Sequence, residues 1–197
     1  MLSVTSYIDD LIELLRQVDP SEVQALVDAL VDAYRNGRFV FVIGNGGSAA
    51  NASHLCEDLG KGTLSDFEGQ KRLKIMSLTD NVPYIMAWAN DEGYERVFVE
   101  QLKNFAEPGA LLIAISGSGN SANVLRAVEY AKSHGMKTFA LTGYDGGRLK
   151  EIADESLHVR SSNMGAVEAV HAVVIHYLMD GLQAEFAAVS AHDLTAD

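Results

Sequence analysis

Five short apolar runs, rich in β-branched and aromatic residues, alternate in this chain with stretches whose apolar residues recur at helical spacing. The runs span residues 38–43, 73–78, 111–116, 137–142 and 156–159. Helical periodicity marks residues 7–17, 20–36, 47–59, 82–89, 121–134 and 165–186. A strand, a helix of this length and a second strand form a right-handed crossover, which makes the two strands parallel. We therefore predict a three-layer α/β fold, with about five parallel strands covered by helices on both faces.

The domain organisation follows from chain length and from the position of the first strand. A chain of 197 residues can bury a sizeable core within one globular domain. We expect residues 1–36 to form N-terminal helices that pack in an oligomer, and residues 37–188 to form the α/β domain. Residues 189–197 are predicted to form a polar C-terminal tail.

Composition excludes several classes of protein. The 27 acidic residues outnumber 15 basic ones, and a net charge of −12 argues against nucleic acid as a partner. A hydrophobic share of 48% is too high for a disordered acidic chain. No apolar run approaches the roughly 20 residues of a membrane span, so no membrane partner is predicted.

The expected compartment is the cytoplasm. The N-terminus lacks a basic region followed by an apolar one, so we predict no secretory signal. The single cysteine, Cys56, cannot form an intramolecular disulfide, which fits a reducing environment. We expect Cys56 to be a buried thiol rather than a nucleophile.

Two strand-to-helix loops have little side-chain bulk. The first runs from Gly44 to Asn51, and the second, from Ser116 to Ser121, places three serines around two glycines. Backbone N–H groups in such loops can approach an anion at the positive end of the following helix. The pair predicts a phosphate cradle that needs few cations, which suits an acidic chain. The alternative is a pair of ordinary tight turns with helix N-caps.

The first loop also fits a dinucleotide-binding fingerprint, through the pattern Gly44-x-Gly46-x-x-Ala49. That fingerprint expects an acidic residue about 20 positions further on, at the end of the second strand. The candidate, Asp80, comes too late in the sequence. A nicotinamide-dependent oxidoreductase is therefore the less favoured interpretation.

Imidazole and carboxylate side chains gather on two predicted helices. His54 and Asp58 stand four residues apart, so they share a helix face and could chelate one metal or contact one substrate. Glu168, His171 and His176 fall on a broad stripe of the last helix. These groups suit zinc, and a carboxylate can act as a general base. A lone helical histidine is commonly packed or solvated, but His54 follows a phosphate-type loop.

Several motifs together resemble the sugar-isomerase (SIS) domain of phosphoheptose isomerases. They occur in order and at matching spacing, from the second helix to about Leu182. The motifs are Gly44-Asn45-Gly46-Gly47-Ser48 with His54, Asn90-Asp91, Ser116-x-Ser118-Gly119-Asn120-Ser121, the stretch from Leu141 to Gly147, and His176.

The resemblance implies an aldose–ketose isomerase that converts sedoheptulose 7-phosphate to D-glycero-manno-heptose 7-phosphate through an enediolate. This reaction supplies heptose precursors of lipopolysaccharide. The resemblance also implies a homotetramer with active sites near subunit interfaces and one zinc ion per site. The implied substrate-binding residues are Asn45, Gly46, Gly47, Asp58, Asn90, Asp91, Ser116, Gly117, Ser118, Ser121 and Glu168.

The implied metal ligands are His54, Asp58, Glu168 and His176. Both histidines keep the family's ligand type, whereas Asp58 replaces a glutamate and Glu168 replaces a glutamine. Two histidines with two carboxylates make a sound zinc site. Glu168 and His176 are eight residues apart, about 12 Å along a helix, so one ion between them needs both side chains extended. We expect Asp58 to be the catalytic base and His176 its acid partner.

Two other functions remain compatible with the fold. Some relatives of these isomerases are tetrameric adaptors that bind a replication initiator protein and lack the metal-binding histidines. The presence of His54 and His176 favours the enzyme. An isomerase acting on another phosphosugar is the second alternative, because the fold alone does not select the substrate.

Overall fold

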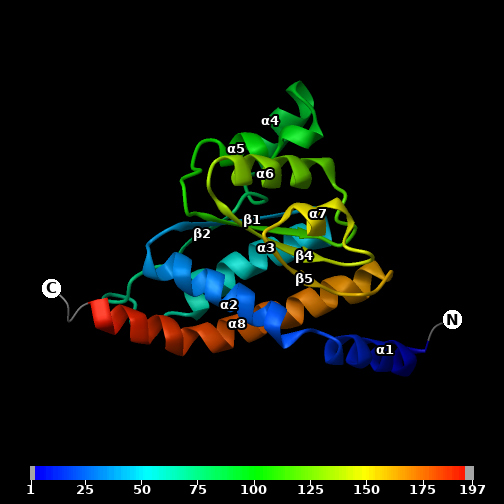
Figure 1. The fold of residues 1–197 in the computed structure, drawn as a ribbon, viewed down its shortest axis with the longest axis horizontal. Coiled ribbons are helices and arrows are strands. Elements are labelled where there is room, and N and C mark those ends of the chain that lie inside the picture. The colour runs from blue at the N-terminus through cyan, green and yellow to red at the C-terminus, as the bar shows by residue number, and fades with distance from the viewer. Residues whose placement is uncertain (1–2, 194–197) are drawn as a thin grey trace.

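The five predicted strands form one parallel sheet in the order β2-β1-β3-β4-β5 in the computed structural model, which describes residues 3–193 (Figure 1). Each strand overlaps its predicted run, which confirms the α/β fold. The strands are β1 (Phe39–Gly44), β2 (Lys74–Ser77), β3 (Leu111–Ser116), β4 (Lys137–Thr142) and β5 (Glu155–His158).

All six predicted helices are present, together with two short α-helices and one 3-10 turn, Tyr94–Arg96, that periodicity did not predict. The predicted helices are α1 (Val4–Arg16), α2 (Pro20–Arg35), α3 (Gly47–Glu57), α4 (Val82–Asp91), α6 (Ala122–Ser133) and α8 (Met164–Asp193). The additional helices, α5 (Val99–Leu102) and α7 (Gly147–Ile152), are too short to show a period in the sequence. None of the helices described is long and apolar enough to cross a membrane.

Helix α8 continues beyond its predicted end, so residues 189–193 of the predicted polar tail are helical. Val189 packs against the hydrophobic core, and the buried Ser190 hydroxyl accepts a hydrogen bond from the Lys71 N–H at 3.0 Å. These contacts hold the last turns of the helix against the domain. Residues 194–197 of the predicted tail lie outside the described part of the chain.

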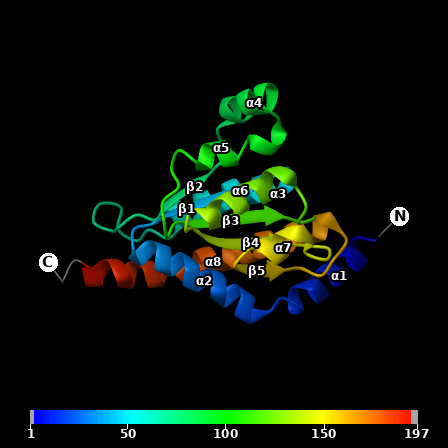
Figure 2. The ribbon, with the colours of Figure 1, turned by 45° about the horizontal axis from the view of Figure 1, so that its top comes forward.

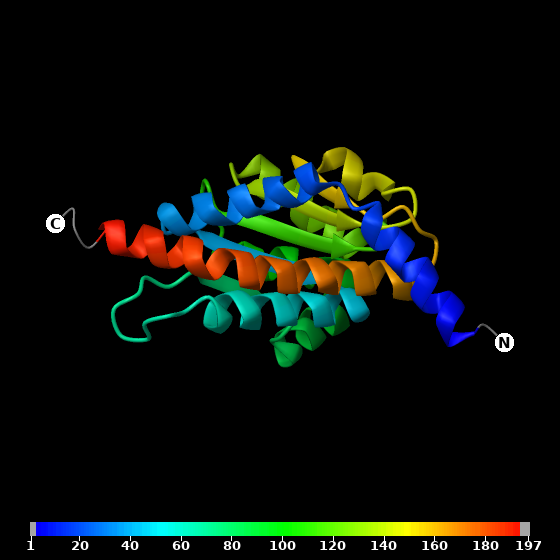
Figure 3. The ribbon, with the colours of Figure 1, turned by 90° about the horizontal axis from the view of Figure 1, so that it is seen from below.

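Helices cover both faces of the sheet, and alternate strand residues belong to different cores. Val40 and Val42 pack in the core under α2, α3 and α8, which lie together on one face (Figure 3). Phe41 and Ile43 pack on the opposite face, in the core that contains residues of α5 and α6. Because both faces are buried, the central strands are continuous apolar runs rather than alternating ones.

The strand order reverses between β1 and β3, and this reversal places the site. Gly44, at the end of β1, pairs with Ile115, which precedes Ser116 at the end of β3. The chain leaves β1 into α3 on one face and leaves β3 into α6 on the other. Ligands of open parallel sheets bind in the crevice at such a point, beyond the carboxyl ends of the strands.

Buried His171 on α8 fastens this helix to the end of β4. The side chain is fully buried, and its Nε2 lies 3.3 Å from the Thr142 carbonyl oxygen. Its Nδ1 has no hydrogen-bond partner among residues 3–193. Burial lowers the pKa of His171 to about 4, so the imidazole is neutral at physiological pH.

The titration of His171 should make the protein less stable in mild acid. In the unfolded chain this histidine has a pKa near 6.5, so it binds a proton below that pH. In the folded protein it binds the proton only near pH 4. The free energy of unfolding should therefore fall below pH 6.5, by on the order of 3 kcal/mol at pH 4 from this residue. Urea denaturation at a series of pH values measures this loss.

The His171→Leu variant should lose much less stability over the same pH range. The Thr142 carbonyl keeps its hydrogen bond from the Val159 N–H at 2.9 Å, so the substitution leaves that oxygen paired. Substitution of the exposed His134 by leucine controls for the loss of a histidine as such. An unchanged pH dependence in His171→Leu would contradict the assignment.

Candidate active site

A reciprocal pair of amide hydrogen bonds joins the two loops predicted to form a cradle. The Asn45 Nδ2 donates to Asn123 Oδ1 at 3.0 Å, and the Asn123 Nδ2 donates to Asn45 Oδ1 at 2.9 Å. Asn45 belongs to the loop after β1, whereas Asn123 is buried in the first turn of α6. The two loops are therefore held side by side. Asn123 was not predicted, although it follows Ser121 by only two positions.

The second loop, Ser116–Ser121, is held rigidly and keeps donors free at the start of α6. Ser121 occupies the N-cap position of α6, but its side chain makes no capping hydrogen bond. Gly119 has a φ of +65°, and a β-carbon there would overlap the carbonyl oxygen of Gly146. The Leu149 N–H also donates to the Gly119 carbonyl at 2.8 Å. The loop offers the hydroxyl and N–H groups that an anion requires at a helix N-terminus.

The N-terminus of α3, in the first loop, already faces a negative charge. The carboxylate of Glu168 lies against Gly47, the first residue of α3, so closely that a β-carbon would overlap it. Asn51 of α3 donates from Nδ2 to the Glu168 carbonyl at 3.1 Å, which fixes α8 against α3. A carboxylate is stabilised at a helix N-terminus. Of the two loops, the second is therefore the better place for a phosphate.

Three predicted residues, His54, Asp58 and His176, come together between α3 and α8. The Asp58 Oδ2 lies 3.4 Å from His54 Nε2 and 3.9 Å from His176 Nε2. One ligand atom from each residue falls within 4.8 Å of the others. Asp58 begins a π-helical turn, Asp58–Gly62, that continues α3, and such turns are frequent at functional sites.

The burial of Asp58 fits this group to a metal ion. Its side chain is only 10% exposed, whereas those of His54 and His176 are 41% and 54% exposed. The buried Oδ2 has no hydrogen-bond partner in the described part of the chain. A cation would supply the missing partner, and neutral imidazoles are suitable additional ligands.

Glu168, the fourth predicted ligand, is not a member of this group. Glu168 and His176 are eight positions apart, more than two turns of α8, and the Glu168 carboxylate reaches Gly47 instead. To join the group, the side chain would have to turn away from Gly47. Glu168 therefore lies beside the first loop. The sequence also predicted that Glu168 contacts the substrate.

Cys56 lies between His54 and Asp58 in the sequence but takes no part in the group. Cys56 is half-buried rather than fully buried as predicted, and this burial, together with the charge of Asp80, raises the pKa of its thiol to about 12. The thiol therefore stays protonated at neutral pH and is a poor nucleophile.

The segment after α4 reaches back to the first loop. Asn90 and Asp91 are exposed at the end of α4, and the Asn90 amide donates to Asp91 at 2.7 Å. Helix α4 stands away from the body of the domain and has no buried residue (Figure 2). Tyr94, which the sequence did not single out, bridges this distance because its hydroxyl lies 2.9 Å from Asn45 Oδ1.

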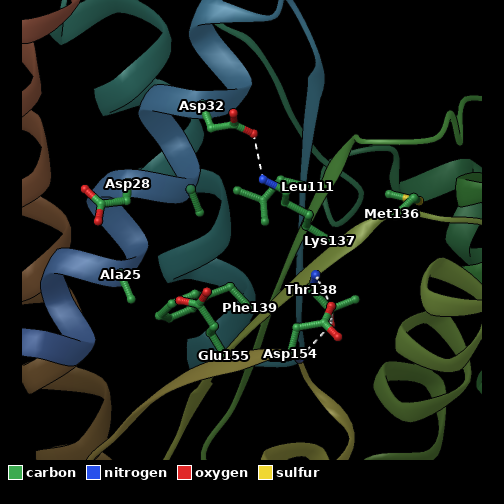
Figure 4. A pocket seen from close by; sticks show the side chains of 11 residues that line it. Ala25, Asp28, Asp32, Leu111, Met136, Lys137, Thr138, Phe139, Asp154 and Glu155 are labelled. Carbon is green, nitrogen blue, oxygen red and sulfur yellow. Dashed lines mark hydrogen bonds and ion pairs between the residues drawn. The ribbon is translucent and has the colours of Figure 1, made fainter.

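A separate cavity of about 550 Å³ lies at the opposite edge of the sheet, between α2 and the first residues of β3, β4 and β5 (Figure 4). Four acidic side chains line it: Asp28, Asp32, Asp154 and Glu155. Lys137, on the same lining, is paired with Asp32 at 2.7 Å. A phosphorylated ligand would meet mostly like charge there, so this cavity does not suit the predicted substrate class.

Comparison with known proteins relates most of the chain to one group of sugar-phosphate enzymes. A family model described as the SIS domain matches residues 6–143. The chain is 40% identical over 162 residues to the phosphoheptose isomerase of Helicobacter pylori strain P12, with 82% of each chain covered. It is 34% identical over 178 residues to a probable phosphoheptose isomerase of Thermoplasma volcanium, which covers 90% of this chain and 89% of that protein.

Solved structures show the same relationship in three dimensions. The phosphoheptose isomerase of Neisseria gonorrhoeae matches with a TM-score of 0.84 and 27% identity, over 92% of this chain and 97% of that one. A phosphoheptose isomerase of Francisella tularensis matches with a TM-score of 0.83 and 31% identity, over 90% and 94%.

The group of three residues should determine metal affinity, and Glu168 should not. We expect His54→Ala to weaken Zn²⁺ binding by at least about tenfold, because it removes a direct ligand. Glu168→Gln should change the affinity by less than about threefold, since a carboxylate outside the group acts only through screened charge. Competition with a chromophoric chelator measures both. Equal weakening in the two variants would make Glu168 a ligand.

Proposed function

The chain belongs to the phosphoheptose isomerase family of SIS domain proteins, and from this premise we propose that it interconverts sedoheptulose 7-phosphate and D-glycero-manno-heptose 7-phosphate. The enzyme is an aldose–ketose isomerase of heptose precursor biosynthesis, which feeds lipopolysaccharide. The observation that carries the proposal is the buried carboxylate of Asp58, which lies between two imidazoles and whose Oδ2 has no hydrogen-bond partner among the described residues. Asp58 follows helix α3, which begins at the first loop. The adaptor alternative finds no support among the relatives described above.

The phosphate group of the substrate binds in the second loop. The residues of this loop that contact the phosphate are Ser116, Gly117, Ser118 and Ser121. The donors are the N–H groups at the start of α6 and the Ser121 hydroxyl, which makes no capping hydrogen bond. The remaining substrate contacts come from the first loop, from the end of α4 and from the start of α8. These residues are Asn45, Gly46, Gly47, Asn90, Asp91 and Glu168.

Proton transfer falls to Asp58 and His176. The Asp58 carboxylate removes the proton from the carbon next to the carbonyl of the open-chain sugar, and the C–H electron pair forms the double bond of the enediolate. Returning the proton to the neighbouring carbon completes the isomerisation. His176 exchanges a proton with the sugar oxygen through the ring nitrogen that does not hold a metal. A zinc ion held by His54, Asp58 and His176 would stabilise negative charge on the sugar oxygens when bound.

We also place the enzyme in the cytoplasm as a homo-oligomer, with a tetramer as the expected state. Association between copies is supported by apolar side chains left exposed on two helices, Val4, Ile8 and Ile12 on α1 and Val173 and Tyr177 on α8. Val173 and Tyr177 flank His176 on α8, so a second copy covering them would bring the catalytic group to a subunit interface.

Turnover of sedoheptulose 7-phosphate by the purified protein tests the function. We expect conversion to the aldose phosphate, with loss of activity in chelator and recovery on adding Zn²⁺. Sedoheptulose without the phosphate is the matched control and should be a poor substrate, because the second loop then has no anion to bind. An absence of turnover by the metal-loaded protein would refute the proposal.

The role of Asp58 has a separate test in exchange of the substrate α-proton with solvent. Asp58→Asn should abolish incorporation of deuterium from D₂O while inorganic phosphate still binds, because the second loop is untouched. Nuclear magnetic resonance of the sugar monitors the exchange. Retained exchange would remove Asp58 from the mechanism.

A further inference from the structure

We propose that Tyr94 is a positioning residue for the sugar chain, because its hydroxyl fixes the orientation of the Asn45 amide. The inference rests on the proposed function, in which Asn45 contacts the substrate. Tyr94 lies outside the motifs singled out in the sequence, and only the fold brings its hydroxyl to Asn45.

The direction of each hydrogen bond follows from one backbone group. The Val124 N–H, which can only donate, lies 3.0 Å from the side-chain oxygen of Asn123. The other amide atom of Asn123 is therefore its nitrogen, which donates to Asn45 Oδ1 at 2.9 Å. Since Asn45 Oδ1 is an acceptor, the Tyr94 hydroxyl must donate its proton to that oxygen.

This chain of bonds leaves Asn45 with one free group. Its oxygen accepts from both Asn123 and Tyr94, and one hydrogen of its nitrogen is used by Asn123 Oδ1. The second N–H hydrogen remains available. A donor fixed in this way suits an oxygen atom of the sugar chain, and a fixed donor costs less ordering on binding than a free one.

The segment that carries Tyr94 is anchored to hold it there. Val97 and Phe98 are fully or almost fully buried in the core beside α5 and α6, whereas Tyr94 itself is 55% exposed. An ion pair between Arg96 and Glu100 at 2.9 Å adds a further contact within the segment. Because Tyr94 contributes little to the core, its substitution should change the orientation of Asn45 in the first loop and leave the free energy of unfolding almost unchanged.

Steady-state kinetics of Tyr94→Phe test the inference. The variant should raise the KM for sedoheptulose 7-phosphate about fivefold, the effect of one hydrogen bond, with kcat changed less than about twofold. Inhibition by inorganic phosphate should be unchanged, because the phosphate occupies the second loop. The matched control is Tyr84→Phe, which removes a hydroxyl that bonds to Asn104 on the neighbouring segment and should keep the wild-type KM.

A double-mutant cycle shows whether Tyr94 acts through Asn45. In an Asn45→Ala background, Tyr94→Phe should have no further effect on KM. The inference is overturned if Tyr94→Phe alone leaves KM unchanged, or if its effect persists undiminished without the Asn45 amide. A fall in kcat and melting temperature at constant KM would show a merely structural role and would also overturn it.

Binding of a non-isomerisable ligand separates this inference from the proposed function. Heptitol 7-phosphate, the reduced form of the substrate, lacks the carbonyl group and can be titrated by calorimetry whether or not the enzyme turns over. If wild-type protein binds it about fivefold more tightly than Tyr94→Phe, the inference stands even without isomerisation. Equal affinities would overturn the inference while leaving measured turnover unaffected.

Discussion

The parallel pairing of β1 with β3 is the contact on which the rest of the site depends. It places the ends of two strands side by side while their following helices, α3 and α6, leave toward opposite faces of the sheet. Ligands of open parallel sheets bind at such a divergence. The reciprocal amide bonds of Asn45 and Asn123 then tie the loops together, and Tyr94 ties a third segment to them. A change of strand order would separate all of these groups.

An acidic protein that binds a phosphorylated sugar must rely on local interactions, because a net charge of −12 repels the ligand at long range. The structure assigns different places to the negative charges near the site. Glu168 faces the positive end of α3, and Asp58 lies between two imidazoles that could share a cation with it. At the start of α6, where we propose that the phosphate binds, the Ser121 side chain makes no capping hydrogen bond. Glu168, Asp58 and the phosphate thus occupy three separate places: the start of α3, the group with His54 and His176, and the start of α6. This separation reduces the repulsion between their negative charges.

The sequence predicted most of the fold and the chemical groups of the site, because both depend on short-range patterns. Strands buried on both faces are continuous apolar runs, and His54 and Asp58 share a helix face whatever the tertiary structure. The remaining features depend on packing between distant segments. Tyr94 and Asn45 are 49 positions apart, and Asn45 and Asn123 are 78 apart, so no local pattern relates them. The position of Glu168 against Gly47 likewise follows from how α8 crosses α3.

The central claim is that the substrate binds across the β1–β3 edge, with its phosphate in the second loop and its sugar chain reaching toward Asp58. A crystal structure of the protein grown with Zn²⁺ and heptitol 7-phosphate tests this claim most directly. We predict phosphate density against Ser116–Ser121 at the start of α6, and a metal ion bound by His54, Asp58 and His176. Phosphate density at the start of α3 with Glu168 displaced, or a metal ion away from these three residues, would contradict it.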